Sequence, residues 1–325
     1  MAELVLMIGI PGIGKSTFRS SFLPYHGLVN LDSIHALLDP ENGHNKNNNR
    51  IARTVEKTII VENLKNGIDT IVDATNIDVR TREKYFAMAD GHKIKAVVFP
   101  TDVERAIYQN TLRERKVPEK VIRMFANKFE NPTTNEGFDG IYDSQNPTGL
   151  LGEKPALFID RDGVLVPTEN GYVNSVDDLG YYGGAINALQ KVSSKGYQIC
   201  IISNQGGVGL GFFKQEELDR INNKITADLV SEGVDLAGIY CCTHKPKQGC
   251  YCRKPNTGMI VRASKEHNLD PTISYMVGDM ASDIIVGNKI GCTSVKVNTG
   301  VQKPLGEVKP DMIYGSLVEF IDAKF

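Results

Sequence analysis

Short, unbroken apolar runs alternate with helix-length stretches along most of the chain. Such runs are typical of strands buried on both faces of a parallel sheet. They occupy residues 4–8, 28–31, 70–72 and 96–99 in the first part of the chain, and 156–159, 199–202, 275–277 and 294–297 in the second. Strand alternating with helix predicts βαβ units. The pattern therefore predicts an α/β fold with two doubly wound parallel sheets.

The alternation lapses between residues 131 and 155, where Asn, Thr, Gly, Asp and Pro predominate. This composition is typical of a boundary between domains, and a length of 325 residues suits two domains. We expect a first domain over 1–130, a linker over 131–154 and a second domain over 155–325. A polar run at 42–49, NGHNKNNN, is predicted to be a loop.

The loop after the first apolar run fits the pattern G-x-x-x-x-G-K-S, between a strand and a helix as that motif requires. Its glycines let backbone N–H groups surround phosphate oxygens, and the helix N-terminus adds positive charge. The lysine is expected to reach the β- and γ-phosphates of ATP, and the serine to bind Mg²⁺. The predicted ATP-binding residues are Gly9, Gly12, Gly14, Lys15, Ser16 and Thr17.

Candidate acceptor-site residues follow the next strands, where ligands collect in open α/β sheets. Asp32 follows the second strand and can take the proton from an attacking hydroxyl; a helix N-cap is the alternative role. Asp73 follows the third strand, with Arg80 and Arg82 beyond it. Residues 113–128 carry a local excess of cations, which suits a lid over a transferring phosphoryl group or a solvated helix face.

This order of motifs resembles the kinase half of the phage polynucleotide kinase-phosphatases, over roughly residues 1–130. The resemblance implies that Asp32 is the general base, that Arg113 is the lid arginine on the phosphates, and that Asp73 organises the acceptor site. His35 stands where the family usually has an arginine. We expect His35 and Arg80 to join Asp73 in binding the substrate.

The second half opens with two carboxylates, Asp160 and Asp162, directly after an apolar run. In an ideal strand they would share a face, so that one can attack phosphorus while the other handles the leaving-group proton. Ser203, Lys254 and Asp279 follow later strands and supply a hydroxyl, a cation and a further carboxylate. Mg²⁺ is needed to hold acidic groups and a phosphate together.

This pattern resembles the haloacid dehalogenase (HAD) superfamily over residues 156–300. The resemblance implies that Asp160 is the nucleophile that forms an aspartyl-phosphate and that Asp162 is the general acid and then base. It also implies Mg²⁺ at Asp160, Asp162 and Asp279, with Asp283 in support. About forty residues separate Asp162 from Ser203, so we expect a Rossmann-like phosphatase with a minimal cap.

Four of the six cysteines lie within twelve residues, which favours a metal site in a reducing compartment over a disulfide framework. The predicted ligands are Cys242, His244, Cys250 and Cys252. Such a closed set suits a structural tetrahedral Zn²⁺, which would fix Arg253 and Lys254 beside the phosphate. This loop and the segment from Asn204 resemble the histidinol-phosphate and heptose-bisphosphate phosphatases. Asn204 and Arg253 are therefore expected to bind substrate, while Leu210 and Met280 replace basic residues common there.

Charge separates the function classes only in part. The chain has 37 Lys and Arg against 39 Asp and Glu, a net charge of −2, which disfavours a polybasic protein that coats nucleic acid. No run approaches the roughly 18 apolar residues of a membrane helix, so we expect a cytoplasmic protein with no membrane partner.

Three functions are compatible with these motifs. The first is an end-healing enzyme with ATP and DNA or RNA termini as partners, which phosphorylates a 5′-hydroxyl and removes a 3′-phosphate. The second is a metabolic kinase fused to a heptose-bisphosphate or histidinol-phosphate phosphatase. The third, a nucleotide-gated binding module, is disfavoured because both catalytic sets are complete.

Overall fold

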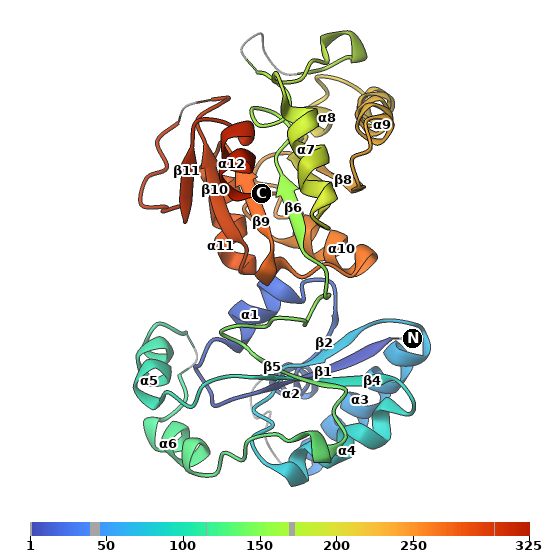
Figure 1. Ribbon diagram of the computed structural model, residues 1–325. Coiled ribbons are helices and arrows are strands. Elements are labelled where there is room, and N and C mark those ends of the chain that lie inside the picture. The colour runs from blue at the N-terminus through green and yellow to red at the C-terminus, as the bar shows by residue number, and fades with distance from the viewer. Residues whose placement is uncertain (1, 40–45, 115, 169–172, 302) are drawn as a thin grey trace. The chain divides into compact units, whose positions relative to one another are not determined.

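The computed structural model describes residues 2–39, 46–114, 116–168, 173–301 and 303–325 (Figure 1). The chain divides into two compact units, Met1–Leu150 and Leu151–Phe325. Both are built on sheets whose strands all run parallel. The predicted α/β class with two parallel sheets is therefore confirmed.

The first unit has a five-stranded sheet in the order β2-β3-β1-β4-β5. Its elements, in chain order, are β1 (Glu3–Ile8), α1 (Lys15–Phe22), β2 (Gly27–Val29), α2 (Leu31–Leu38), α3 (Lys46–Lys65), β3 (Thr70–Val72), α4 (Val79–Ala89), β4 (Lys93–Val98), α5 (Val103–Thr111), α6 (Glu119–Asn127), η1 (Thr134–Glu136) and β5 (Gly140–Asp143).

Both faces of this sheet are covered, which explains why its strands are continuously apolar. Leu4 and Leu6 of β1 pack in one core cluster with residues of α3 and α4. On α1, Phe18 stacks on Phe22 at 4.5 Å between ring centroids and meets Phe99 edge-on at 5.5 Å. Alternate β1 side chains point to opposite faces, and both sets are buried.

The second unit has a six-stranded sheet in the order β11-β10-β9-β6-β7-β8. Its elements are β6 (Ala156–Ile159), η2 (Val176–Asp178), α7 (Ala185–Ser194), β7 (Gln198–Asn204), α8 (Gly206–Leu210), α9 (Gln215–Ser231), β8 (Leu236–Cys242), α10 (Gly258–His267), η3 (Pro271–Ile273), β9 (Tyr275–Gly278), α11 (Ala281–Ile290), β10 (Thr293–Val297), β11 (Met312–Tyr314) and α12 (Leu317–Lys324).

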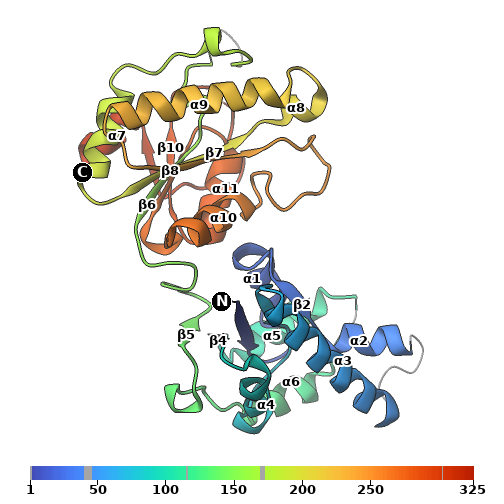
Figure 2. The same cartoon turned by 90° about the vertical axis from the view of Figure 1, so that its right-hand side faces the viewer.

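Helices also cover both faces of this second sheet. Figure 2 shows α7 and α9 on one side of it and α10 and α11 on the other. Helix α12 packs against α7. The strand β6 therefore lies in the middle of the unit, and its carboxyl end, followed by Asp160, opens at the edge where ligands bind in such sheets.

Two sequence predictions about loops need correction. The segment 131–154 was expected to be a linker, yet β5 within it pairs with β4, and residues up to Leu150 belong to the first unit. Its polar composition reflects an edge strand only four residues long. The run at 42–49 was expected to be a loop, but α3 begins at Lys46.

No helix among the described residues is long and apolar enough to cross a membrane.

Candidate active sites

The P-loop in the first unit takes a shape that only glycine permits at two positions. Gly12 and Gly14 have φ angles of 85° and 107°, in the left-handed region that favours glycine. A Cβ on Gly12 would lie 2.5 Å from the backbone oxygen of Ala106. The start of α1 has no side-chain cap, so its first backbone N–H groups can bind an anion.

Lys15 and Ser16 lie at the start of this helix. Lys15 is only 9% exposed, and its Nζ donates to the carbonyl oxygens of Gly9 and Ile10, both at 2.8 Å. Burial lowers the pKa of Lys15 to about 8, although the Asp73 carboxylate opposes the shift. Ser16 Oγ donates to Asp73 Oδ2 at 3.3 Å, so a hydroxyl and a carboxylate meet beside the phosphate-binding loop.

The N-cap of α2 is Asn30 rather than Asp32. The Asn30 side chain accepts from the Ser33 backbone N–H at 2.9 Å and donates to the Asp73 carbonyl at 2.8 Å. Asp32 lies in the first turn of α2 and is exposed. This arrangement removes the capping role as the explanation for Asp32.

One cavity of about 500 Å³ gathers most of the predicted kinase residues. The predicted residues that line it are Gly12, Gly14, Lys15, Ser16, Asp32, His35, Asp73 and Arg113. Arg53 of α3 and Tyr85 of α4 also line it, and the sequence analysis did not single them out. Both bind the buried Glu56 carboxylate, at 3.0 Å from Arg53 Nη1 and 2.8 Å from the Tyr85 hydroxyl.

Other residues of the predicted kinase site lie elsewhere. Arg80 is exposed and does not line the cavity, and Thr17 does not line it either. Arg82 is fully buried, and its Nε and Nη2 bind the Glu136 carboxylate at 2.7 and 2.9 Å. Gly9 contributes its carbonyl to Lys15. Arg115, part of the predicted basic segment, lies outside the described residues.

The segment that carries Arg113 is braced by Asn110. The Asn110 side chain accepts from the Val117 backbone N–H at 2.9 Å and donates to the Val117 carbonyl at 2.8 Å, which closes the turn between α5 and α6. Arg123, another cation of this segment, pairs with Glu119 and Glu104 on the surface. Of the cations of this segment that the structure describes, only Arg113 lines the cavity.

In the second unit, three carboxylates and one lysine share the end of the central strands. One oxygen from each of Asp160, Asp279 and Asp283 lies within 4.8 Å of the others. Lys254 Nζ lies 3.0 Å from Asp160 Oδ1 and 2.7 Å from Asp283 Oδ1. Burial raises the pKa of Asp160 and of Asp279, the latter to about 6, while Lys254 opposes both shifts.

This group is short of positive charge. Lys254 pairs directly with two of the three carboxylates, and the buried Lys296 acts on Asp279 and Asp283 while its Nζ donates to the Val297 carbonyl. Three ionised carboxylates still outnumber these two cations, and buried carboxylates need a cation or a proton. Asp279 Oδ1 is buried with no hydrogen-bond partner among the described residues, while its Oδ2 accepts from the Val301 backbone N–H at 3.0 Å. The donor set is all oxygen, which suits Mg²⁺.

Asp162 does not join this group. Arg161 Nε and Nη2 hold the two Asp162 carboxylate oxygens at 3.0 and 2.9 Å. Gln205 Nε2 donates to Asp162 Oδ2 and lies the same 2.7 Å from Ser203 Oγ. Asp162 lies just past the end of β6 at Ile159 and before the turn at Gly163, where φ is 87°, and its charge helps to raise the pKa of Asp160.

Asn204 and Lys254 are locked together at the same edge of the sheet. The Asn204 side chain accepts from the Lys254 backbone N–H at 2.9 Å and donates to the Lys254 carbonyl at 3.1 Å. Asn204 thus positions Lys254, whose Nζ also donates to the Ile202 carbonyl at 2.6 Å. Arg253 Nη1 donates to the His244 carbonyl at 3.4 Å.

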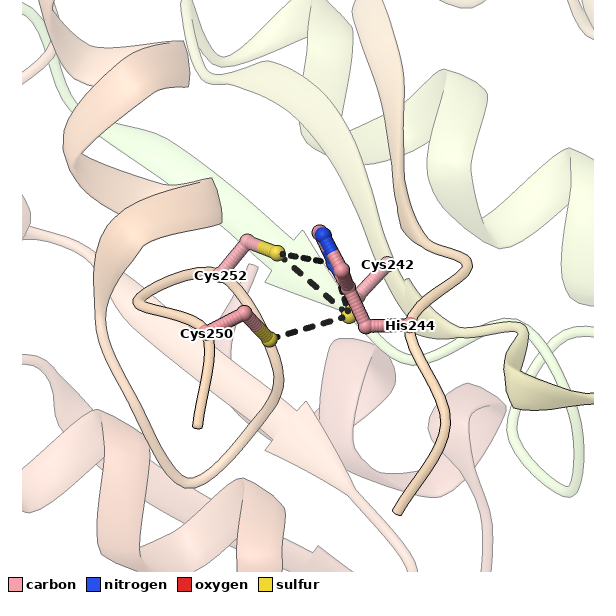
Figure 3. A group of neighbouring side chains, drawn as sticks. All are labelled: Cys242, His244, Cys250 and Cys252. Atoms are coloured by element: carbon pink, nitrogen blue, oxygen red, sulfur yellow. Dashed lines mark hydrogen bonds between the residues drawn. The ribbon is translucent and has the colours of Figure 1, made fainter. Parts of the chain in front are cut away.

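The predicted metal ligands of the second unit lie together at the end of β8 and on the loop that follows it (Figure 3). Their ligand atoms all fall within 4.8 Å of one another, and these residues are Cys242, His244, Cys250 and Cys252. Cys242 Sγ lies 3.7 Å from Cys250 Sγ and 3.4 Å from Cys252 Sγ, too far for a disulfide bond of about 2.05 Å. The group could hold one metal ion.

The neighbouring Cys241 stands apart from this group. Its sulfur accepts from Asn222 Nδ2 of α9 at 3.6 Å.

Comparison with known proteins divides the chain in the same way. A family model described as an AAA domain matches residues 4–132, and one described as HAD-hydrolase-like matches residues 251–320. The D-glycero-beta-D-manno-heptose-1,7-bisphosphate 7-phosphatase of Haemophilus ducreyi is 38% identical over 177 residues, which are 52% of this chain and 97% of that protein.

Solved structures show likenesses of lower score. The D,D-heptose 1,7-bisphosphate phosphatase from B. bronchiseptica, complexed with magnesium and phosphate, aligns with a TM-score of 0.48 and 26% identity, over 52% of this chain and 97% of that one. A chain of the Pnkp1/Rnl/Hen1 RNA repair complex aligns with a TM-score of 0.37 and 16% identity, over 92% of this chain and 96% of that one.

The family matches confirm the predicted fusion of a P-loop kinase domain with a HAD-type phosphatase, so the protein is an enzyme with both phosphotransferase and phosphatase machinery. The chain belongs to the family of HAD-like phosphatases that includes the heptose-bisphosphate phosphatases, and it joins that phosphatase unit to an AAA-type P-loop kinase unit.

Proposed function

We propose that the protein heals nucleic-acid ends. Its first unit transfers the γ-phosphate of ATP to a 5′-hydroxyl of DNA or RNA, and its second unit removes a 3′-phosphate. The single observation that carries this proposal is the presence of two opposed phosphate chemistries in one chain: a kinase cavity lined by Lys15, Asp32 and Arg113, and a separate phosphatase carboxylate group. On one small substrate these activities would tend to cancel. On a broken strand they act at different ends and together produce ligatable termini.

In the kinase unit, we assign a task to each of five residues that line the cavity. Lys15 and the N-terminus of α1 bind the ATP phosphates. Asp32 takes the proton from the 5′-hydroxyl while the 5′ oxygen bonds to the γ-phosphorus of ATP. The bond between the γ-phosphorus and the oxygen that bridges it to the β-phosphate breaks, and ADP is released. Arg113 stabilises the charge that develops on the transferred group, and His35 lies at the acceptor side with Asp73.

In the phosphatase unit, an Asp160 oxygen attacks the phosphorus of the 3′-phosphate. The 3′ oxygen leaves with a proton from Asp162. Water then hydrolyses the aspartyl-phosphate, and Asp162 accepts the proton of that water. Ser203 and Lys254 bind the phosphate oxygens, and Arg253 lies beside them on the metal-binding loop.

Two metals are part of the proposal. Asp160, Asp279 and Asp283 would hold Mg²⁺ in the phosphatase unit, and Ser16 would hold it in the kinase unit. Bound there, Mg²⁺ neutralises phosphate and carboxylate charge. The Cys242, His244, Cys250 and Cys252 group would hold a structural Zn²⁺. Sulfurs in a tetrahedral zinc site lie about 3.8 Å apart, because each Zn–S bond is about 2.3 Å, which is close to the distances between these sulfurs. The thiolates suit a reducing compartment such as the cytoplasm.

A second candidate function rests on the sequence relatives. The 38% identity to a heptose-bisphosphate 7-phosphatase covers nearly all of that protein, which favours a sugar bisphosphate as the phosphatase substrate. The kinase unit would then phosphorylate a metabolite. Leu210 and Met280 stand against this function, because they provide no cation for a second phosphate.

One set of parallel activity assays separates the two functions. The full-length protein is given ATP, Mg²⁺ and a short oligonucleotide with a 5′-hydroxyl and a 3′-phosphate, and in parallel heptose bisphosphate and histidinol phosphate. We expect a 5′-phosphate and a 3′-hydroxyl on the oligonucleotide, each detected by gel mobility and mass. An oligonucleotide unchanged at both ends, with rapid release of phosphate from a metabolite, would reject the end-healing proposal.

A further inference from the structure

Two segments of the second unit adjoin beside the phosphatase site. One is 204–215, which contains α8, and the other is the metal-binding loop 243–257. A Cβ on Gly209 would lie 2.4 Å from the Thr243 backbone oxygen and 3.0 Å from the Lys245 nitrogen, and one on Gly206 would lie 2.9 Å from Arg253 Nη1. The two segments therefore pack directly on one another, and we call their exposed face the rim surface.

The rim surface carries only positive charge. Neither segment contains an Asp or a Glu, and together they contain five Lys and Arg residues. Lys254 is buried in the carboxylate group, whereas Arg253 is partly exposed. The remaining cations are exposed, and these residues are Lys214, Lys245 and Lys247. The nearest acidic residue that follows in the chain, Glu216, already belongs to the first turn of α9. A surface of this kind attracts a polyanion.

The same surface exposes large apolar side chains. Phe212 is 76% exposed, Leu210 47% and Tyr251 61%. The Phe212 backbone N–H donates to the Gly207 carbonyl of α8 at 2.9 Å, so the backbone of Phe212 is attached to this helix. Gly207 is the neighbour of Gly206, which packs against Arg253. Single exposed apolar residues are ordinary on protein surfaces, but here they are interleaved with cations and with no carboxylate.

We propose that the rim surface binds the single-stranded 3′ end of the nucleic acid, with Phe212 stacked on a base near the terminal phosphate. This inference rests on the proposed 3′-phosphatase function and names its substrate as a single strand. Proteins that bind single strands combine a basic track for the backbone with aromatic rings on which bases stack. Every nucleobase presents a flat π face, which fits an exposed phenylalanine ring.

The position of the rim surface fits this occupant. Asn204 opens one segment and holds the Lys254 backbone of the other at 2.9 Å, and Lys254 Nζ lies 3.0 Å from the Asp160 carboxylate. A strand whose 3′-phosphate reaches Asp160 therefore has the rim surface next to its path. Its phosphates would then meet Arg253, Lys245 and Lys247.

The stacking contact is tested with Phe212→Ala and Phe212→Tyr in the full-length protein. The substrates are a hexathymidylate with a 3′-phosphate and para-nitrophenyl phosphate, which carries no base. We expect Phe212→Ala to raise KM for the hexathymidylate by roughly five- to 150-fold, the range seen when a stacked aromatic is removed. Activity toward para-nitrophenyl phosphate should stay unchanged, and Phe212→Tyr should retain the wild-type KM. Ile313→Ala, which truncates another exposed apolar residue on the far edge strand β11, is the matched control.

The basic track is tested separately with the double variant Lys245→Gln and Lys247→Gln. The slope of log KM against log salt concentration for the hexathymidylate should fall by about 1.4, because two phosphate contacts are lost and each contributes about 0.7 on a single strand.

Three outcomes decide between the ideas. A selective KM effect of Phe212→Ala supports the rim surface as the binding site. Wild-type hydrolysis of the hexathymidylate with no effect of Phe212→Ala and no change of salt slope would overturn this inference and leave the proposed function standing. No hydrolysis of the hexathymidylate by the wild-type protein, with para-nitrophenyl phosphate still hydrolysed, would overturn the proposed function itself.

Discussion

Lys15 is held in place before any nucleotide binds, between the carbonyl oxygens of Gly9 and Ile10. Burial lowers its pKa to about 8 in the free protein. ATP phosphates favour the protonated amine, so binding must restore a proton that is lost above pH 8. We predict that ATP affinity falls as the pH rises from 8 to 9.5, by up to about tenfold per pH unit.

Calorimetry in two buffers of different ionisation enthalpy measures this proton uptake directly. Close to one proton should be taken up at pH 9, and almost none at pH 6.5. Lys15→Met should bind ATP weakly with no uptake at either pH. Equal affinity of the wild-type protein at pH 7 and pH 9.5 would contradict the prediction.

The Gln205 side-chain amide donates to Asp162 Oδ2 at 2.7 Å and also lies 2.7 Å from Ser203 Oγ. Replacing it by a residue of similar length without an amide leaves Asp162 to Arg161 alone. We expect Gln205→Met to lower kcat for para-nitrophenyl phosphate by roughly ten- to hundredfold, less than the roughly 10²–10⁴-fold that a general acid–base contributes, because Arg161 still holds Asp162, with little change in KM. Gln198→Met, at the opposite end of β7, should leave kcat unchanged.

Neighbouring residues with the same chemistry have different fates in this structure. Arg80 and Arg82 were both candidates for the acceptor site. Side chains two positions apart on a helix point about 200° away from each other, so Arg80 is exposed whereas Arg82 is buried against Glu136. Sequence spacing does not say which side of α4 faces the cavity. For the same reason Arg53 and Tyr85, which line the cavity from two other helices, could not be singled out.

At the scale of elements, the loop that carries the proposed zinc ligands also carries a residue of the phosphatase site. Its four ligands lie within eleven residues, and the chain passes directly from Cys252 to Arg253 and Lys254. We predict that Cys250→Ser removes the bound zinc, lowers the melting temperature and abolishes 3′-phosphatase activity, while kinase activity remains.

Elemental analysis and calorimetry check this loss. Cys241→Ser is the matched control, because Cys241 lies next to the group but contacts Asn222 instead; it should retain about one zinc per chain. Full phosphatase activity in metal-free protein would rule out the structural role.

The ion pair between Arg82 and Glu136 attaches the chain after α6 to the first unit. Both side chains are at least nine-tenths buried, and removing one partner of such a pair typically costs about 3–5 kcal/mol. We expect Glu136→Ala to lower the free energy of unfolding of the first unit by that amount, measured by urea denaturation of a fragment 1–150. Exposed Glu83→Ala on the same helix as Arg82 should change it by less than about 0.5 kcal/mol.

This pair also explains the limit of the sequence boundary. The composition of 131–154 predicted a linker, but the Arg82–Glu136 ion pair and the four residues of β5 attach this segment to the first unit, which extends to Leu150. Such tertiary contacts leave no periodicity in the sequence. The strands at the centre of each sheet, by contrast, are unbroken apolar runs, and their positions were predictable.

At the scale of the whole molecule, each activity depends on residues of one unit. We predict that Lys15→Ala abolishes only the phosphorylation of 5′-hydroxyl ends and that Asp160→Asn abolishes only the removal of 3′-phosphates. Assays of both ends of one oligonucleotide check this. Loss of both activities from either single change, in protein that remains folded by circular dichroism, would show that the two sites are not independent.

The local motifs were the most predictable part of the molecule, because the P-loop, the two carboxylates after β6 and the metal ligands are each set by short spacings along the chain. The grouping of Asp160 with Asp279 and Asp283 was partly predictable from their positions after strands. The diversion of Asp162 to Arg161 was not, because it depends on a backbone turn just past the end of β6.

The strand order has a consequence for how the chain folds as it leaves the ribosome. The first unit ends with an edge strand, β5, so all of its sheet has been synthesised by Leu150. The second unit begins with a central strand, β6, which pairs with β9, so Leu157 must wait for Tyr275. The kinase unit can therefore complete its fold during translation. The phosphatase unit must hold the apolar strand β6 unpaired on one side until more than a hundred further residues have emerged, somewhat longer than β1 of the first unit waits for β4, and an unpaired strand edge is where a chain aggregates.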